Sequence, residues 1–223
     1  MGGGSRLGCA LTVIFPKWTN LLPTLLGITA ACAGTLATGV VWIYFSPKNT
    51  DVGYSPDQPV FYSHKLHAGL MGMDCRYCHQ NVELGPNATV PTTETCMNCH
   101  ATVLTDRAAI QDIKAAHDAG QPMPWVKVHL LPDYAYFNHS AHIGAGVGCV
   151  TCHGRVDEME IVRQEQPLSM SWCLDCHRNP EPFLRPDGIE VTDMAYVRDA
   201  DDGLDLKDAR NLQPPVYCSG CHR

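Results

Sequence analysis

Five copies of one short motif carry most of the chemistry that this sequence could perform. Ten of its twelve cysteines form Cys-x-x-Cys pairs, and a histidine directly follows each pair. In chain order, the first to fifth motifs hold Cys75, Cys78 and His79; Cys96, Cys99 and His100; Cys149, Cys152 and His153; Cys173, Cys176 and His177; and Cys218, Cys221 and His222. Two thiols at this spacing can add to the two vinyl groups of a haem, and the next imidazole can bind its iron. The motifs therefore predict five covalently bound c-type haems with these histidines as proximal iron ligands.

Zinc is the alternative cofactor that paired cysteines suggest. The gaps from Cys78 to Cys96 and from Cys152 to Cys173 leave 17 and 20 intervening residues, which suits a four-cysteine zinc site. Histidine makes up only 11 of the 223 residues. Five pairs all followed by histidine would therefore arise by chance with a probability on the order of 10⁻⁷. The fifth pair would also lack a partner pair, so haem is the better prediction.

An internal repeat organises the haem region. The segment Phe61-Tyr-Ser-His64-Lys-Leu-His67 recurs as Phe137-Asn-His139-Ser-Ala-His142, and His139 follows His64 by 75 residues. Each repeat precedes two of the motifs. The region is therefore predicted to contain two duplicated dihaem modules, each headed by an H-x-x-H pair, and a fifth haem at the C-terminus.

Six histidines outside the motifs are candidates for the second axial position of the irons. The predicted distal ligands are His64, His67, His129, His139 and His142, and His117 is the spare. Imidazoles three residues apart lie about 60° apart around a helix, so one H-x-x-H pair could serve two neighbouring haems. His117 lies near the end of a predicted helix over 105–120, capped by Thr105 and ended by Gly120, where a cation is favoured without any ligand role.

Methionine is the rival distal ligand. Met170 precedes Cys173 by three residues, and Met159 follows His153 by six. A haem with histidine and methionine ligands has a higher potential than one with two histidines. Methionine more often fills irregular gaps in a core. One haem with a histidine and a methionine ligand therefore stays open as an alternative to histidine ligands throughout.

A long uncharged segment precedes the haem region. Residues 18–47 carry no charged side chain, and their apolar part, 21–45, has 25 residues. As a helix it would be roughly 37 Å long, enough to cross a bilayer of ~30 Å. Trp42, Tyr44 and Phe45 near its end resemble an aromatic belt. The run is longer than the apolar part of a cleaved signal peptide, about 7–15 residues, so a retained single-pass anchor is predicted.

The predicted fold class is mainly α with much irregular structure. The segments are a cytoplasmic N-terminus (1–20), a transmembrane helix (21–45), a linker (46–60), dihaem module 1 (61–120), a bridging segment (121–136), dihaem module 2 (137–180) and a C-terminal segment with the fifth haem (181–223). Haem is attached outside the cytoplasm, so the haem domain is predicted on the periplasmic face of a bacterial plasma membrane.

Charge narrows the range of partners. The formal net charge is −7, which argues against nucleic acid as a binding partner. Residues 181–210 contribute −5 of it. This acidic segment reads either as a solvated loop around the fifth haem or as a docking surface for another subunit or a basic electron carrier.

The residues also carry a family resemblance. The segment from Phe61 through His64 and His67 to the first motif, and Trp125-Val-Lys-Val-His129 with the second repeat, resemble the membrane-anchored pentahaem cytochrome c subunit of bacterial alternative complex III. The resemblance covers about 60–180. It implies an electron-transfer subunit of a quinol:acceptor oxidoreductase that works with integral-membrane quinol-oxidising subunits, an iron–sulfur subunit and an optional monohaem cytochrome c. The implied acceptor is a periplasmic cytochrome c, a copper protein or a terminal oxidase.

Two other functions remain open. A stand-alone membrane quinol dehydrogenase usually carries C-x-x-C-H-x-Met at its first haem, whereas Gln80 and Asn81 follow His79. A multihaem reductase with an open iron typically carries C-x-x-C-Lys, whereas all five motifs here end in histidine. The iron at the fifth motif could keep one axial position open only if His129 does not bind it. The sequence contains no group of residues with the pattern of an acid–base or nucleophilic catalytic site, so no catalytic residue is predicted on this chain.

Overall fold

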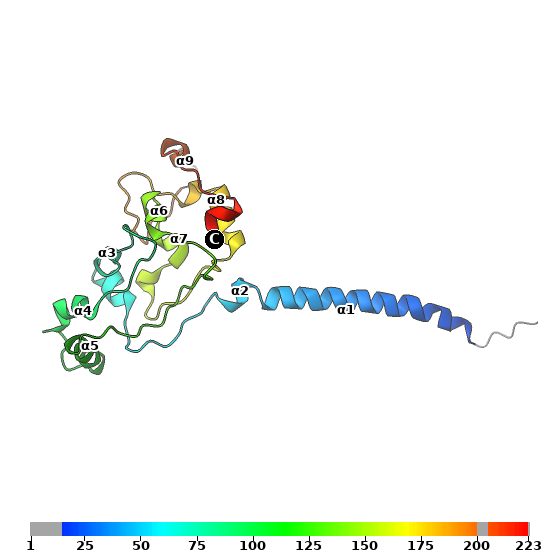
Figure 1. The fold of residues 1–223 in the computed structure, drawn as a ribbon, viewed down its shortest axis with the longest axis horizontal. Helices are drawn as coiled ribbons and strands as arrows, with labels where there is room; N and C mark the ends of the chain where they lie inside the picture. Colours follow the sequence, from blue (N-terminus) through cyan, green and yellow to red (C-terminus); the bar gives the residue numbers. More distant parts are fainter. Residues whose placement is uncertain (1–14, 200–204, 223) are drawn as a thin grey trace, which may run out of the picture. The chain divides into compact units, whose positions relative to one another are not determined.

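The computed structural model describes residues 15–199 and 205–222. The chain divides into two compact units, Met1–Ser46 and Pro47–Arg223, which are described separately (Figure 1).

The first unit is built on one long helix. A 3₁₀ turn, Lys17–Leu21, leads into α1, Leu22–Tyr44, and Pro23 sits in the first turn, where a missing N–H costs little. None of the side chains of α1 is buried by protein. By length and composition the span Lys17–Tyr44 could cross a membrane, although a signal sequence near an N-terminus has the same character. Helix α1 lies within the segment 21–45 that the sequence predicts to be a transmembrane helix.

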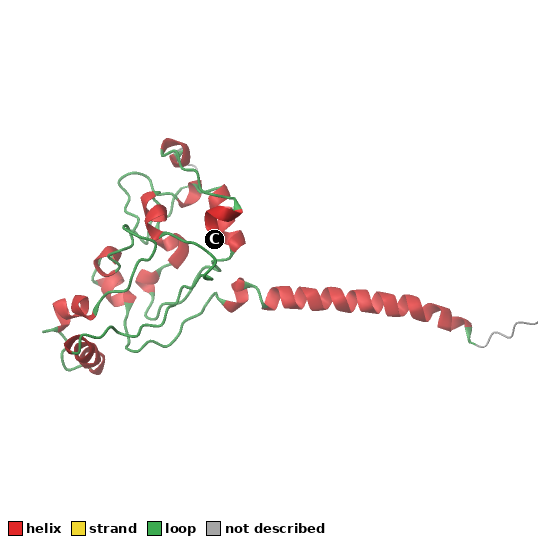
Figure 2. Ribbon diagram, in the orientation of Figure 1, coloured by secondary structure: helices red, strands yellow, loops and turns green. Residues whose placement is uncertain are grey.

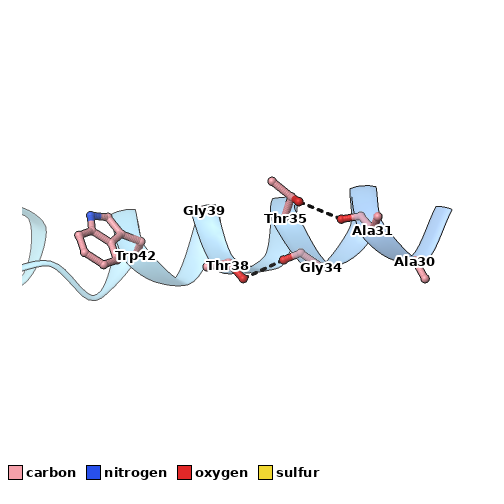
Figure 3. Close-up of a pocket in the computed structure, with 7 residues that line it drawn as sticks. All are labelled: Ala30, Ala31, Gly34, Thr35, Thr38, Gly39 and Trp42. Atoms are coloured by element: carbon pink, nitrogen blue, oxygen red, sulfur yellow. Dashed lines mark hydrogen bonds between the residues drawn. The ribbon is translucent and has the colours of Figure 1, made fainter. Parts of the chain in front are cut away.

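One side of α1 is lined by small residues and Trp42. They leave a shallow groove bordered by Ala30, Ala31, Gly34, Thr35, Thr38, Gly39 and Trp42 (Figure 3). The Thr35 and Thr38 hydroxyls donate to the carbonyl oxygens of Ala31 and Gly34, at 2.9 and 2.8 Å. These hydroxyls are therefore satisfied within the helix, as an apolar surrounding requires.

The second unit consists of short helices joined by turns and irregular segments (Figure 2). In chain order the helices are α2 (Pro47–Thr50), a π turn (Lys65–Leu70), α3 (Cys75–Cys78), α4 (Thr93–His100), α5 (Ala108–Asp118), α6 (His139–Gly144), α7 (Cys149–His153), α8 (Met170–Arg178), α9 (Leu206–Ala209) and α10 (Cys218–Cys221), with 3₁₀ turns at Val156–Glu158 and Glu181–Phe183. The described residues form no β-strand, only isolated bridges. The prediction of a helical and irregular fold is confirmed.

Polar side chains begin several of these helices. Asp74 accepts from the Arg76 N–H at 2.8 Å and caps α3, Asn138 accepts from Ser140 N–H at 3.0 Å and caps α6, and Ser169 caps α8. Such caps matter because helices of a few residues are marginal on their own.

The boundaries of α5 correct one sequence prediction. The helix starts at Ala108, and Arg107, not Thr105, occupies the N-cap position without a side-chain hydrogen bond. Its predicted end is confirmed, because Gly120 adopts φ +63° and its N–H donates to the His117 carbonyl oxygen at 2.9 Å. A positive φ at a helix end suits glycine.

The side-chain core of the second unit is thin. Among the described residues, the buried apolar side chains are Val60, Ile113, Met159, Leu184 and Leu206. A unit of this length normally buries far more apolar surface of its own. Side chains alone therefore contribute little to holding the unit together.

Residues of the predicted linker take part in the second unit. Gly53 N–H donates to the Gln164 carbonyl oxygen at 2.7 Å, and Gln164 N–H returns a bond to Tyr54 at 3.0 Å. The Ser55 hydroxyl donates to Val162 at 2.9 Å. The chain after α2 thus lies along residues 162–164.

Candidate haem sites

Each motif places its two cysteines on one helical turn. The pairs lie on α3, α4, α7, α8 and α10, and the histidine ends or directly follows the turn. None of the ten motif cysteines forms a disulfide. One turn brings side chains three residues apart to the same side of a helix, which is the placement that two thioether bonds to one porphyrin need.

Seven histidines hydrogen-bond through Nδ1 to a backbone carbonyl oxygen, at distances from 2.6 to 3.2 Å. They are His79, His100, His177 and His222 of the motifs and His67, His139 and His142 of the H-x-x-H pairs. A carbonyl oxygen can only accept, so Nδ1 carries the ring proton and Nε2 keeps its lone pair. Metal-binding histidines are oriented by this kind of hydrogen bond.

Two further histidines have a buried ring nitrogen without a hydrogen-bond partner: His64 Nδ1 and His129 Nε2. Burial, followed by the nearby imidazoles of His79 and His67, lowers the pKa of His64 to about 4. Burial also lowers the pKa of His129. Both rings are therefore neutral near pH 7, the form that binds a metal. A buried nitrogen with no partner costs free energy unless a ligand satisfies it.

The distances between imidazole rings test whether irons fit between them. A bond from a metal to an imidazole nitrogen is about 2.0–2.1 Å long, and the ring centroid lies about 1.1 Å behind that nitrogen, so two imidazoles on opposite sides of one iron have centroids roughly 6.3 Å apart. The measured separations are 6.3 Å for His67 and His100, 6.4 Å for His139 and His153, and 6.0 Å for His142 and His177. In each pair an H-x-x-H histidine faces a motif histidine. The separations of these three imidazole pairs therefore fit a haem iron bound between the two rings.

The order of these pairs repeats in the two modules. The second histidine of each H-x-x-H pair, His67 or His142, faces the second motif of its module. The first histidine of the second pair, His139, faces the first motif of its module. In the first module, His64 and His79 lie close enough for the His79 imidazole to lower the pKa of His64.

His153 lies where several imidazoles gather. Desolvation by the surrounding protein, and then the imidazoles of His129, His139, His79 and His64, lower the pKa of His153 to about 3. Its ring contacts that of His129 edge-on at 4.4 Å. This separation is too short for the two rings to bind one iron from opposite sides.

The fifth motif has a different neighbour. The His222 ring lies 5.8 Å from the Tyr134 ring, and its Nδ1 bonds the Tyr134 carbonyl oxygen at 3.2 Å. In the described part of the chain no ring contact joins His222 to His129. Met159 is buried in the core at 5% exposed, whereas Met170, the first residue of α8, is 66% exposed.

Aromatic rings support both H-x-x-H pairs in the same way. Tyr62 stacks on His67 at 4.5 Å and meets His64 edge-on at 4.8 Å. Phe137 stacks on His142 at 4.6 Å and meets His139 edge-on at 4.7 Å. The residue equivalent to Phe137 is therefore Tyr62. The sequence repeat begins with Phe61 instead, which is 65% exposed; counting two residues back from each first histidine would have found Tyr62.

The alternative zinc site finds no support in the geometry. Within residues 15–199 and 205–222, no three side chains of cysteine, histidine, aspartate or glutamate converge in a way that could hold a metal ion. The cysteine pairs do not combine into a four-thiolate cluster, one of the arrangements that bind structural zinc.

Two family models match the second unit. Residues 44–130 match the class III cytochrome c family, and residues 135–223 match cytochrome c7 and related cytochrome c. The two matches fall on the two repeats of the sequence. A curated relative, the multiheme cytochrome c subunit of menaquinone reductase from Nitratidesulfovibrio vulgaris, is 35% identical over 98 residues. That alignment covers 44% of this chain and 46% of the relative, so the chain spans about half the length of that protein.

Proposed function

We propose that this multihaem cytochrome c is the electron-transfer subunit of a membrane quinol oxidoreductase, and that it relays electrons through five c-type haems. The observation that carries the proposal is the set of three imidazole pairs at 6.0 to 6.4 Å. An iron held by two imidazoles has no open position for a substrate, which suits electron transfer. The proposed function assigns no catalytic residue to this chain.

Three of the proposed axial pairs are these measured pairs, and the fourth is assigned by the equivalence of the two modules and the proximity of His79 to His64. The proposed axial pairs are His79 with His64, His100 with His67, His153 with His139, and His177 with His142. When bound, each haem supplies one-electron chemistry. The chain attaches each haem through two cysteines, and six of these eight imidazoles are held through Nδ1 so that Nε2 is left to bind the iron.

The fifth haem is proposed to bind at Cys218, Cys221 and His222. His129 is the proposed distal ligand, because its buried Nε2 has no hydrogen-bond partner and because its contact with His153 excludes it from the opposite face of that iron. Met170 and Met159 are the alternatives. Burial of Met159 in the core favours a packing role for it.

The proposed setting is the outer face of a bacterial plasma membrane. The apolar helix α1 supports a single-pass anchor, and covalent haem attachment supports a periplasmic haem unit. The proposed partners are integral-membrane quinol-oxidising subunits, an iron–sulfur subunit and an optional monohaem cytochrome c, as in alternative complex III. The proposed acceptor is a periplasmic cytochrome c, a copper protein or a terminal oxidase.

In a second candidate function, electrons pass through the same haems in the opposite direction. The curated relative is named as a subunit of a menaquinone reductase, and a relay of bis-imidazole haems has no intrinsic direction. In that case the chain would receive electrons outside the membrane and pass them to a quinone-reducing partner.

The first test is a haem count by pyridine haemochrome together with the low-temperature electron paramagnetic resonance (EPR) spectrum of the oxidised protein. Five haems per chain, all low-spin, are expected. Replacing Cys218 and Cys221 by alanine should lower the count to four. A stoichiometric high-spin signal that shifts when a small ligand is added would reject the relay in favour of an enzyme with an open iron.

A further inference from the structure

Residues 184–193, here called the clamp segment, pack against the entry to the third motif. Leu184 pairs with Val147 in an isolated antiparallel bridge and is 1% exposed. Arg185 N–H donates to the Gly146 carbonyl oxygen at 2.8 Å, and Cys149 N–H donates to the Val191 carbonyl oxygen at 3.0 Å. The clamp segment thus follows the chain that leads into α7.

The Arg185 side chain secures this contact. It is 5% exposed, and its guanidinium donates to the carbonyl oxygens of Asp193 and Tyr196 at 2.8 and 3.0 Å. The guanidinium also lies 4.5 Å above the Tyr196 ring. A Cβ atom at Gly148 would overlap it. Glycine directly before Cys149 therefore allows the buried arginine to pack beside the third motif.

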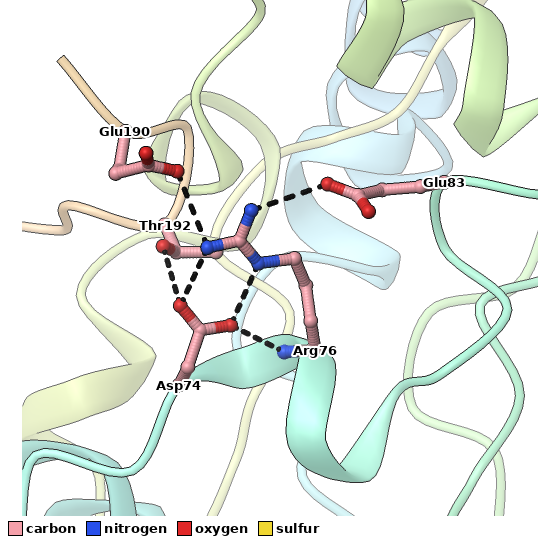
Figure 4. Close-up of polar contacts among 5 residues, drawn as sticks. All are labelled: Asp74, Arg76, Glu83, Glu190 and Thr192. Atoms are coloured by element: carbon pink, nitrogen blue, oxygen red, sulfur yellow. Dashed lines mark hydrogen bonds and ion pairs between the residues drawn. The ribbon is translucent and has the colours of Figure 1, made fainter. Parts of the chain in front are cut away.

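The same segment reaches α3 of the first motif. The Thr192 hydroxyl donates to Asp74 Oδ2 at 3.0 Å, and Glu190 pairs with Arg76 at 3.2 Å. Arg76 also binds Asp74, the N-cap of α3, and pairs with Glu83 at 3.2 Å. Figure 4 shows the Arg76 guanidinium between the three carboxylates, with Thr192 beside Asp74.

The two motifs that the clamp segment touches also touch each other. The side chains of Cys75 and Cys149 lie close enough to interact. These are the first cysteines of the first and third motifs, which occupy equivalent positions in the two modules. The proximal imidazole of His79 also lies near that of His153. The modules therefore meet at their first haem-attachment turns.

We propose that the clamp segment is a positioning element that fixes the separation between α3 and α7, and so between the two haems attached there. This inference rests on the proposed function. Its anchor on the α7 side is the backbone of Arg185 and Val191, and its contacts on the α3 side are Glu190 and Thr192. The acidic C-terminal region thereby gains a role within the chain.

A positioning role explains these contacts better than stability does. The side chains of Arg76 and Glu190 are 35% and 69% exposed, and ion pairs this exposed to water contribute little to the free energy of folding. Selecting one position of α3 relative to α7 also requires free energy, which the backbone hydrogen bonds of Arg185 and Val191 and the bond from Thr192 supply together with this ion pair.

The test compares variants that remove a clamp contact with matched variants that do not. Thr192→Val removes the hydroxyl without changing charge, and Thr102→Val is its control, because the Thr102 hydroxyl bonds only the nearby Cys99 carbonyl oxygen at 3.4 Å. Glu190→Gln removes one carboxylate from Arg76. Glu83→Gln removes another from the same guanidinium at the same 3.2 Å, without touching the clamp segment.

The readouts are the haem count, the EPR spectrum and a potentiometric titration of the full-length protein in detergent. Thr192→Val and Glu190→Gln should retain the wild-type haem count and change the magnetic and redox interaction between one pair of haems. Thr192→Ser, which keeps the hydroxyl, should restore that interaction. Glu83→Gln should shift a potential through charge alone and leave the pairwise interaction intact, and Thr102→Val should change neither.

Two results would overturn the inference, and they differ. Wild-type pairwise interaction in both Thr192→Val and Glu190→Gln, with all haems present, would show that the clamp segment does not set the spacing. A wild-type protein with fewer than five haems or with a high-spin iron would instead refute the proposed function.

Discussion

Hydrogen bonds to backbone carbonyl oxygens fix the orientation of individual imidazole rings in this protein. His139 donates from Nδ1 to Pro86 at 2.7 Å, and His177 donates to Pro215 at 2.7 Å. Each bond fixes both the tautomer and the rotation of the ring. The histidines themselves could be found from the sequence, because the motif and its repeat are local patterns. Their carbonyl partners could not, since Pro215 lies 38 residues from His177 and is brought there by the fold.

At the same scale, a change of distal ligand should alter one haem. In His142→Met, the potential of one haem should rise by on the order of 100 mV, because a thioether favours ferrous iron more than an imidazole does. A potentiometric titration followed by haem absorbance measures this shift. His117→Met is the control and should leave the titration unchanged. Identical titrations of His142→Met and the wild type would refute the assignment of His142 as a ligand.

The aromatic supports allow a second prediction at this scale. Tyr62→Phe should be tolerated, because Phe137 supports the other H-x-x-H pair with no hydroxyl. Tyr62→Ala should lower the free energy of unfolding by about 2 kcal/mol, since it removes a half-buried ring. It should also broaden the low-spin EPR signals, because His64 and His67 lose their packing partner. Equal stability and equal spectra of the two variants would contradict the supporting role.

At the scale of elements, the short helices depend on their ends and on remote contacts. The sequence predicted the glycine end of α5 correctly, because a glycine with positive φ is a local signal. It misplaced the start at Thr105, since the chain completes another turn before helical geometry begins. The sequence predicts the acidic region 181–210, which contains the clamp segment, as a solvated loop or a docking surface and does not predict its contacts within the chain. Its attachment to α7 uses backbone hydrogen bonds, which leave no trace in residue types.

The cap of α3 gives a prediction about pH. Hydrogen bonds from Arg76 hold the pKa of Asp74 at about 2, below the value of about 3.9 for an unfolded aspartate. A lowered pKa stabilises the fold above pH 4, and this stabilisation is lost as the pH falls from about 4 to 2. The wild type should therefore lose more stability over this range than Asp74→Asn, which keeps a capping oxygen. Denaturant unfolding at pH 7, 4 and 2.5 measures the difference, and parallel pH profiles would contradict it.

At the scale of the whole molecule, the fate of α1 determines whether the protein is anchored to a membrane. If α1 is a retained anchor, the protein should stay with membranes through salt washing and be released by detergent. The mass of the released protein, with its haems, should include residues 17–44. A soluble protein whose mass begins after residue 46 would identify the helix as a cleaved signal sequence instead.

The thin side-chain core has a consequence for biogenesis. With only a few apolar side chains to bury, the polypeptide has little drive to collapse before its cofactors are attached. If the haems are attached outside the cytoplasm, as proposed, the chain would cross the membrane while still extended and would become compact only after attachment. A copy that misses one attachment would keep part of its backbone open to proteases. Under the proposed function, covalent attachment would thus also act as quality control, because only copies that carry all their haems would resist degradation.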